Sequence, residues 1–406
     1  MKRNSTPIII GFVSFLIATT VGFASVNTLS ISLIPYIRVA ALAISIICIL
    51  LHVLSVGIIK STAFSVAVVI LLSIVALASG PSRINRIDLL PDVLVSTGIV
   101  ILGIIYFRPA KDANNTIAVA QYFVIFSYIV IIFLITTNGL EINRNIRFNY
   151  DIRTEAGSLI RYSQGASKFF GLAAVASAWL ASKAISLREK LLFWLSLLIF
   201  TGLAFIGGGR GDFLALLILI VGLTAFQNWR GAILAAAPIV LIHFFGIQLL
   251  QNLSGNVVAA DRFLALLQGD TVLGTRDILF RNAIELIANE PRCFLVGCGY
   301  TYFQDYYGYS YGLYPHNFLL EAVIVWGAPL VFISATFFVV GFLTKPQNDF
   351  ITWAGLFFVL IAMKSGDVIG SWFALSFLYY HIGVGLFVTF GGVKSKQQRV
   401  YGNQVK

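Results

Sequence analysis

The sequence predicts an all-α fold, a polytopic bundle of about twelve transmembrane helices. Of its 406 residues, 58% are hydrophobic and only 11% are charged, whereas soluble domains carry roughly 25% charged residues. Apolar runs of about 20 residues, the length that a helix needs to cross a bilayer, recur along almost the whole chain. We therefore expect residues 1–406 to form a single integral membrane domain with one larger excursion out of the membrane.

The expected spanning helices follow the apolar runs in order. They lie near residues 8–26, 37–59, 61–79, 92–107, 117–137, 165–184, 190–208, 212–227, 231–252, 316–342, 350–363 and 371–390. The runs 92–107, 212–227 and 350–363 are the shortest, so they also fit tilted or re-entrant segments. The first run follows Met1-Lys2-Arg3, as in a signal peptide, but it is long enough to span and many spans follow it.

Basic residues in the short loops separate the two sides of the membrane. One side collects Lys2, Arg3, Lys60, Arg108, Lys111, Lys183, Arg188, Lys190, Arg230, Lys345, Lys394, Lys396, Arg399 and Lys406. The positive-inside rule makes that side cytoplasmic, and an even number of spans places both termini there. The opposite side then holds a first loop at 138–164, a long loop at 253–315 and the turn Gly207–Asp212.

The basic residues of those three opposite-side segments are all arginines, against the usual charge bias. They are Arg144, Arg147, Arg153, Arg161, Arg210, Arg262, Arg276, Arg281 and Arg292. Because arginine binds phosphate and carboxylate groups in a bidentate way, acidic partners or an anionic ligand would explain them. The net charge of +11 also suits membrane lipids with anionic headgroups. The basic residues are too dispersed to indicate nucleic-acid binding.

The long loop is expected to be partly helical. Residues 275–290 form an amphipathic pattern that Thr275 can cap and that Pro291 ends. Gly297-Cys298-Gly299 then predicts a tight turn, followed by tyrosines and glycines as far as Tyr314. Such tyrosines suit stacking on sugars and suit a membrane interface equally well. Tyr314 is therefore a candidate substrate-binding residue.

The cysteines form neither a framework nor a metal site. Cys293 and Cys298 share the long loop and can pair if it faces an oxidising compartment. Cys48 lies in an apolar run and is expected to be a packing residue. No spacing of cysteine and histidine is typical of a metal site, so we expect no metal ligands and no cofactor.

His316 is the strongest candidate for chemistry. Ionisable groups at the membrane are costly, and the ordinary pKa of histidine, about 6.5, lets it accept a proton at neutral pH. Pro315 precedes it, so we expect His316 in the first turn of the next spanning helix, where the helix N-terminus disfavours imidazolium. A surface histidine at a helix cap is the alternative. His52, His243 and His381 lie in apolar runs and are expected to be packing residues.

Two polar residues follow His316 on the expected helix. Asn317 and Glu321 are four residues apart and therefore share a face. Glu321 can orient His316 or an arginine, or it can be a neutral structural carboxyl, and the sequence does not choose between these. Both residues are candidate substrate-binding groups.

Three arginines are candidate ligands for an anion. Arg276 lies at the start of the loop helix, where backbone N–H groups favour an anion. Arg281 ranks below it, because Asp277 and Glu285 at i−4 and i+4 offer a salt bridge instead. Arg210 lies among glycines that let a backbone approach a ligand closely, and Asp212 can cap the next helix.

Together these motifs resemble the bacterial O-antigen polymerase and ligase superfamily, the Wzy and WaaL family. That family has an arginine in a short outer turn, then a long periplasmic loop that opens with a small residue and an arginine and closes with His-Asn-x-x-Leu. The matching stretches are Gly208-Gly-Arg210-Gly, Gly274-Thr-Arg276, Asn289-Glu-Pro291, Gly297-Cys-Gly299, His316-Asn317-Phe-Leu-Leu320 and Gly327. They cover residues 205–330, and hydropathy agrees over the rest.

The resemblance implies a GT-C-like, metal-independent membrane glycosyltransferase of the bacterial inner membrane, with its active site facing the periplasm. Its donor and acceptor would be oligosaccharides on undecaprenyl diphosphate. His316 would deprotonate the acceptor hydroxyl, whose oxygen would attack the anomeric carbon with inversion. Arg210 and Arg276 would bind the diphosphate and stabilise its departing charge.

Two alternatives remain beside polymerisation. A ligase would transfer the polysaccharide to lipid A-core instead of another repeat unit. The Tyr-Pro-His-Asn-x-x-Leu-Glu form and the arginine-containing loop 138–164 resemble polymerases more. A flippase for lipid-linked oligosaccharides would need no histidine base, and a carrier would more often place its charges near the midplane in paired repeats. A chain-length regulator is a further candidate partner.

Overall fold

The computed structural model describes residues 5–20, 33–57, 60–79, 86–137, 139–141, 147–148, 152–153, 159–160, 164–227, 248, 250–254, 257–267, 275–310, 313–344 and 348–391. These residues are helical apart from four two-residue strands and the connecting loops. Six helices are long and apolar enough to cross a membrane, and three shorter apolar helices accompany them. The chain is therefore an all-α, multi-pass membrane protein, as predicted. The total of about twelve spans stays a prediction.

The chain divides into two compact units, which are described separately. Unit 1 comprises Met1–Leu51, Pro109–Val272 and Asn348–Phe357. Unit 2 comprises His52–Arg108, Leu273–Gln347 and Phe358–Lys406.

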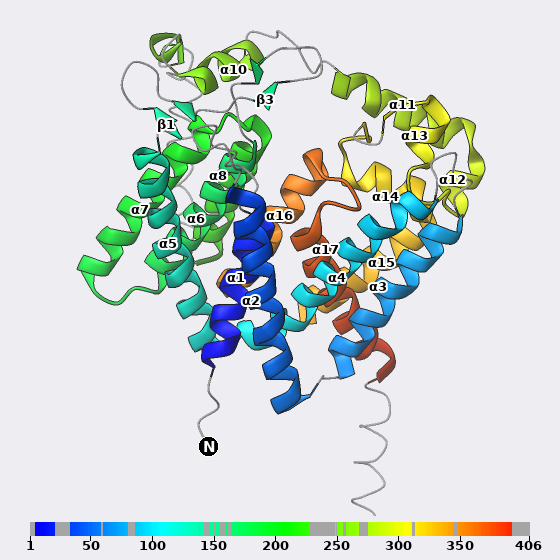
Figure 1. The fold of residues 1–406 in the computed structure, drawn as a ribbon, viewed down its shortest axis with the longest axis horizontal. Helices are drawn as coiled ribbons and strands as arrows, with labels where there is room; N and C mark the ends of the chain where they lie inside the picture. The colour runs from blue at the N-terminus through cyan, green and yellow to red at the C-terminus, as the bar shows by residue number, and fades with distance from the viewer. Residues whose placement is uncertain are drawn as a thin grey trace, which may run out of the picture. The chain divides into compact units, whose positions relative to one another are not determined.

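Unit 1 is built around helix α6 (Gln164–Lys183), which packs against α5 (Ala113–Thr136), α7 (Leu187–Ile206) and α8 (Arg210–Gln227) (Figure 1). α6 is rich in alanine and is buried along almost its whole length. Small side chains let membrane helices approach closely, which favours dispersion contacts between them. α1 (Thr6–Thr20) packs on α5, completing the core.

The remaining elements of unit 1 are either short or belong to helices that are divided between the two units. The first part of α2 (Leu33–Val56) and of α16 (Phe350–Ser365) belongs to it, with α10 (Val258–Leu267). In the loop predicted at 138–164, β1 (Leu140–Glu141) pairs with β2 (Arg147–Phe148), and β3 (Ile152–Arg153) pairs with β4 (Leu159–Ile160), both antiparallel. These two small hairpins were not predicted from the sequence.

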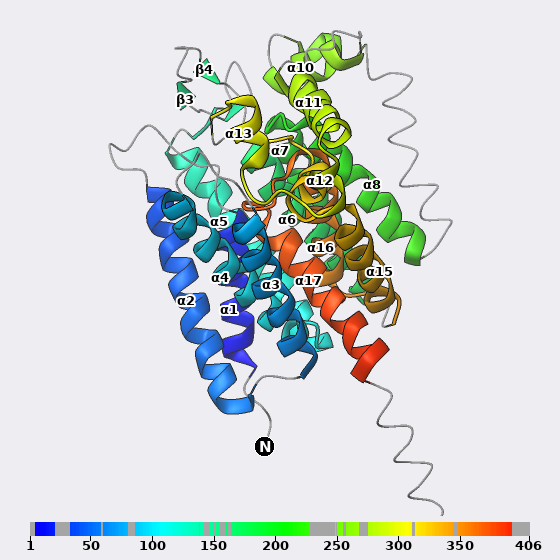
Figure 2. The same ribbon diagram turned by 90° about the vertical axis from the view of Figure 1, so that its right-hand side faces the viewer.

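Unit 2 has its core where α3 (Lys60–Ser79), α15 (Ala328–Thr344) and α17 (Trp372–Leu386) run side by side (Figure 1, Figure 2). Glycines make this approach possible. A Cβ on Gly383 would collide with Ser65, and one on Gly385 would collide with the backbone of Phe337. α4 (Arg86–Ala110) joins this core through Phe107, and α17 continues as the π-helix η1 (Phe387–Gly391).

A layer of short helices covers one end of the unit 2 bundle (Figure 1). It contains α11 (Thr275–Asn289), α12 (Pro291–Leu295), α13 (Tyr302–Tyr307) and α14 (Phe318–Trp326). A small apolar core of Leu279, Ala283, Leu286, Phe303 and Ile324 joins α11 and α13 to α14. The loop helix predicted at 275–290 is therefore confirmed to within one residue.

The prediction of one continuous span at 316–342 is wrong. The chain forms α14, breaks at Gly327 and continues as α15. Gly327 has a φ of 83°, and a Cβ there would lie 2.9 Å from the backbone nitrogen of Gly297. A segment far away in the sequence therefore lies against the break, and Pro329, which has no backbone N–H, follows it two residues later. The expected span 231–252 lies outside the described residues except at its C-terminal end.

Candidate functional site

His316 has a strained backbone at the entrance to α14. Its φ of 53° is left-handed, a conformation shared among the described non-glycine residues only by Thr301, and such outliers often mark functional positions. The expected place of His316 in the first helical turn is wrong, because α14 begins at Phe318. Asn317 is the N-cap instead, and its side chain accepts a hydrogen bond from the Leu320 backbone at 3.0 Å.

The His316 ring packs on a fixed tyrosine. The ring centroids of Tyr314 and His316 lie 4.2 Å apart, and the planes are inclined by 50°. The Tyr314 hydroxyl donates a hydrogen bond of 3.3 Å to the Ser365 carbonyl at the end of α16, which holds that ring in place. Nδ1 of His316 is buried and has no hydrogen-bond partner among the described residues. Buried polar atoms are normally paired, so this nitrogen indicates a missing partner.

Charges around the ring keep His316 neutral. Burial and, to a smaller extent, the positive charges of Arg276 and Lys364 together lower the pKa of His316 to about 4. A neutral imidazole at pH 7 retains a lone pair that can accept a proton. Burial also raises the pKa of Tyr314, helped by Asp367 and Glu321, so its hydroxyl remains a donor. Arg276 acts on both rings and thus belongs to this site.

Glu321 holds the neighbouring loop. Its side chain is buried in α14, and its Oε2 accepts a hydrogen bond of 3.1 Å from the backbone of Val368, in the loop between α16 and α17. Asp367 orders the same loop by accepting a hydrogen bond of 2.6 Å from Gly370. Of the alternatives left open for Glu321, these contacts favour the structural one.

Arg281 is already engaged in a salt bridge. Its guanidinium lies 2.9 Å from Asp277, one turn earlier on α11, and its side chain is 76% exposed. This is the structural alternative that the spacing indicated. The structure does not bring Arg281 together with His316 as it does Arg276.

The turn that carries Arg210 lies in unit 1 and is described by itself. Gly208 has a φ of 74°, and the backbone of Gly209 donates to Ser167 Oγ at 2.9 Å. A Cβ on Gly209 would lie 2.8 Å from both Ser167 Oγ and Asp212 Oδ2, so only glycine fits. The prediction that Asp212 caps α8 is wrong, because the helix begins at Arg210 and encloses Asp212 in its buried first turn.

Three residues near His316 were not predicted from the sequence. Lys364, Ser365 and Asp367 reach the site from the end of α16 and the loop after it. The sequence did contain an indication of these residues, because Lys364-Ser-Gly-Asp367 is a polar interruption between two apolar runs. That indication was weak, because no local sequence pattern connects this stretch with His316, nearly fifty residues earlier.

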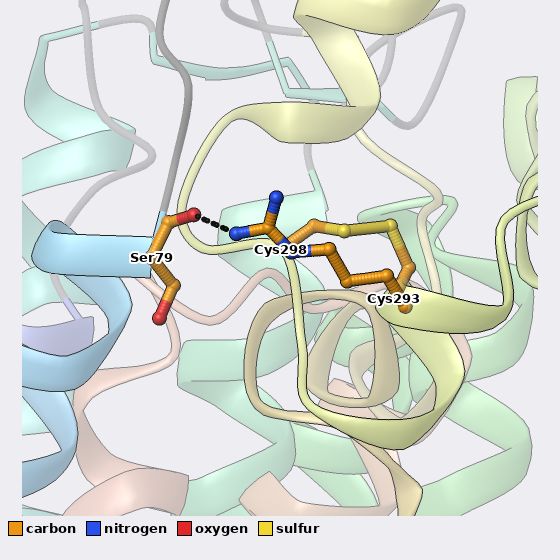
Figure 3. Close-up of a disulfide and its surroundings, with 4 residues drawn as sticks. Ser79, Cys293 and Cys298 are labelled. Carbon is orange, nitrogen blue, oxygen red and sulfur yellow. Dashed lines mark hydrogen bonds between the residues drawn. A yellow bond between two sulfur atoms is a disulfide. The ribbon is translucent and has the colours of Figure 1, made fainter.

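The two loop cysteines, Cys293 and Cys298, form a disulfide with a Cα–Cα distance of 4.8 Å (Figure 3). Cys48 is free. Disulfides are typical of oxidising compartments. Within the described part of the chain, no group of three or more His, Cys, Asp and Glu residues could hold a metal ion.

Comparison with known proteins adds no identification. No family model, no curated protein and no solved structure matches the chain. The function therefore has to be inferred from the neutral histidine, its charged neighbours and the membrane setting.

Proposed function

We propose that the chain is a membrane glycosyltransferase that polymerises undecaprenyl-diphosphate-linked repeat units of O-antigen or a related surface polysaccharide. The observation that carries the proposal is His316, a neutral imidazole on a strained backbone beside Arg276 and Lys364, whose buried Nδ1 has no partner in the described part of the chain. A base next to fixed positive charge suits a reaction in which a hydroxyl loses a proton while an anionic group departs. The motifs shared with the Wzy and WaaL family support the same reaction.

The proposed reaction is a single inverting displacement. His316 takes the proton of the acceptor hydroxyl, and the acceptor oxygen forms a bond to the anomeric carbon of the donor sugar. The bond from that carbon to the diphosphate oxygen breaks, and its electron pair leaves with the diphosphate. Arg276 stabilises the departing charge, and Arg210 is the second proposed diphosphate ligand. The reaction balances without a metal ion or a cofactor.

Donor binding would also strengthen the base. In the protein without ligand, the charges of Arg276 and Lys364 help to lower the pKa of His316. A bound diphosphate would offset those charges, so the pKa of His316 would rise toward the ordinary value for histidine. His316 would then be a better proton acceptor when the leaving group is in place.

The other candidate site residues take supporting roles. Asn317 caps α14 and Arg281 pairs with Asp277, so we assign neither a contact with substrate. Tyr314 fixes the His316 ring, and Glu321 fixes the loop that follows α16.

The proposed setting is the bacterial inner membrane, with a GT-C-like bundle of about twelve spans and both termini in the cytoplasm. The lysine-rich short loops support this orientation. The Cys293–Cys298 disulfide supports it too, because it lies in the same layer as α14 and requires an oxidising side such as the periplasm. The active site would then face the periplasm.

A lipopolysaccharide gel tests the proposal. A deletion strain would be complemented with wild type, His316→Ala or His52→Ala, the last a histidine in α2 as a matched control. We expect His316→Ala to leave a core-plus-one-repeat band without a ladder, and His52→Ala to restore the ladder. Immunoblots would show equal amounts of the variants in the membrane.

The same gel separates the alternatives. Loss of every O-antigen band with lipid-linked polymer accumulating on the periplasmic face would indicate a ligase. Loss without such accumulation would indicate a flippase. A normal ladder with His316→Ala would remove the base and refute the mechanism.

A further inference from the structure

Three consecutive apolar residues are exposed outside the spanning helices. Phe294, Leu295 and Val296 are 44%, 57% and 66% exposed. They belong to the segment Pro291–Gly299, here called the strap, which contains α12 and the disulfide. Single exposed apolar residues are ordinary, but a contiguous group at a fixed position often marks an interaction surface.

The strap is held so that these side chains cannot turn inward. Cys293 and Cys298 are both buried and joined by the disulfide on either side of them. The backbone of Cys298 donates to the Ile324 carbonyl at 2.7 Å, and that of Gly299 donates to the Val325 carbonyl at 3.1 Å. The strap thereby pairs carbonyls at the C-terminal end of α14 that the helix itself leaves unsatisfied.

The strap also lies against the end of a spanning helix. Arg292 donates a hydrogen bond of 3.4 Å to the carbonyl of Ser79, the last residue of α3 (Figure 3). The backbone of Tyr300, just after the strap, donates to the Ala76 carbonyl in the last turn of α3 at 3.2 Å. Helix ends of this kind lie where the hydrocarbon core meets the lipid headgroups.

The helix next to the strap also exposes apolar side chains. α12 contacts α15, the short apolar helix that begins directly after Gly327. On α15, Phe332 is 74% exposed and Ile333 is 50% exposed, as expected of side chains that face lipid. The positive charge of Arg292 beside the apolar group suits a phosphate headgroup.

We propose that Phe294, Leu295 and Val296 insert into the bilayer at the boundary between headgroups and acyl chains. Lipid, rather than another protein, is the partner, because the strap lies at the end of the spanning helix α3 and α12 contacts α15, an apolar helix with exposed apolar side chains. Insertion would fix the depth of the strap and, through the carbonyls of Ile324 and Val325, the depth of α14. The inference does not depend on the reaction proposed for His316.

Site-specific fluorescence tests the insertion. The environment-sensitive amino acid dansylalanine would replace Leu295 in the full-length protein, reconstituted in phosphatidylethanolamine and phosphatidylglycerol vesicles. Lipids carrying a nitroxide near the top of the acyl chain would serve as quenchers. The matched control places the same residue at Ser310, which is exposed in the loop after α13.

We expect blue-shifted emission and at least twofold stronger quenching at 295 than at 310. Emission typical of water at position 295, without quenching, would overturn the proposal. Blue-shifted emission without quenching by lipid would also overturn it, because a second copy or another protein would then cover the strap. If the variant at 295 does not fold, as judged by size-exclusion chromatography, the same comparison at Val296 decides.

Discussion

At the scale of single residues, His316 occupies a state that costs free energy in the folded protein. A left-handed backbone costs a non-glycine residue roughly 1–2 kcal/mol, and an unpaired buried polar atom costs about 1–3 kcal/mol. His316 carries both features. Such costs persist where the surroundings dictate the conformation, here through Asn317 at the cap and Tyr314 against the ring.

The pH dependence of sugar transfer should report this state. Because the pKa of His316 is lowered to about 4 in the protein without ligand, the base is neutral above that pH and is lost by protonation below it. We expect kcat/KM, which reflects the free enzyme, to fall only as the pH approaches about 4. We expect kcat, which reflects the donor complex, to begin falling at higher pH, because the diphosphate offsets Arg276 and Lys364.

The measurement is a pair of pH profiles on purified enzyme with lipid-linked repeat units. Arg276→Gln provides the control: removing one positive charge should move the acid limb of kcat/KM upward while lowering the rate. Coincident acid limbs for kcat and kcat/KM in the wild type would contradict the proposed effect of the donor.

Sequence spacing predicted which residues meet at the candidate site better than it predicted their geometry. His316, Arg276 and Tyr314 were predicted from a polar loop that meets an apolar run, and the structure brings them together. The left-handed backbone could not be predicted, because it depends on which residue caps α14. Lys364 could not be assigned either, because its role depends on tertiary packing between segments far apart in the chain.

At the scale of elements, the strap and a local Gly-Ala-Pro sequence together separate α14 from α15. The apolar run 316–342 contains two glycines, Gly327 and Gly341, and one proline, Pro329, although its length alone favours one span. Gly297 of the strap lies against the break, where a Cβ would be 2.5 Å from the Val325 carbonyl oxygen. Pro329 has no N–H to donate to the Val325 carbonyl in a continuous helix. The break therefore has a local cause as well as this long-range contact, which the pattern of apolar residues does not encode.

Alanine substitutions at two left-handed glycines, Gly297 in the strap and Gly308 at the end of α13, should separate crowding from backbone strain. Gly297→Ala adds a left-handed alanine and a collision, so we expect a loss of about 3 kcal/mol of stability. Gly308→Ala adds only the left-handed alanine, because nothing lies within 4 Å of its Cβ, and should cost about 1 kcal/mol. Thermal unfolding in detergent measures the loss of stability in each variant. Equal losses would show that a Cβ at position 297 meets no steric conflict with α14.

The disulfide should stabilise the strap by a moderate amount. Closing so short a loop is worth roughly 2 kcal/mol by the chain-entropy model. We expect the Cys293→Ser, Cys298→Ser double variant to unfold at lower temperature than wild type, and a reductant to lower the wild-type transition but not that of the variant. A wild-type transition unaffected by complete reduction, checked by thiol counting against Cys48, would contradict this role.

At the scale of the whole molecule, the length of the apolar runs in the sequence predicted the positions of the helices well. Of the expected spans, those that fall on described residues correspond to helices, except where Gly327 divides one of them. Periodicity and length suffice here because a membrane helix must satisfy its backbone internally. The division into two units could not be predicted, because it follows from which helices pack together, and uniformly apolar helices carry little information about their neighbours.

Orientation in the membrane is the remaining prediction, and two exposed positions test it. In a Cys48→Ser background, Ile185→Cys places a thiol between α6 and α7, where the native side chain is 96% exposed. Ser310→Cys places one in the layer that holds the disulfide. Because both sites are exposed, a difference in labelling reports the side of the membrane and not burial.

A membrane-impermeant maleimide applied to cells with a permeabilised outer membrane should label Ser310→Cys at once. It should label Ile185→Cys only after the inner membrane is broken, because the lysines near that turn favour the cytoplasm. Non-reducing gels would verify that the native disulfide is intact in both variants. The opposite labelling would place His316 in the cytoplasm, on the wrong side for polymerising exported repeat units and in a compartment where the disulfide would be reduced.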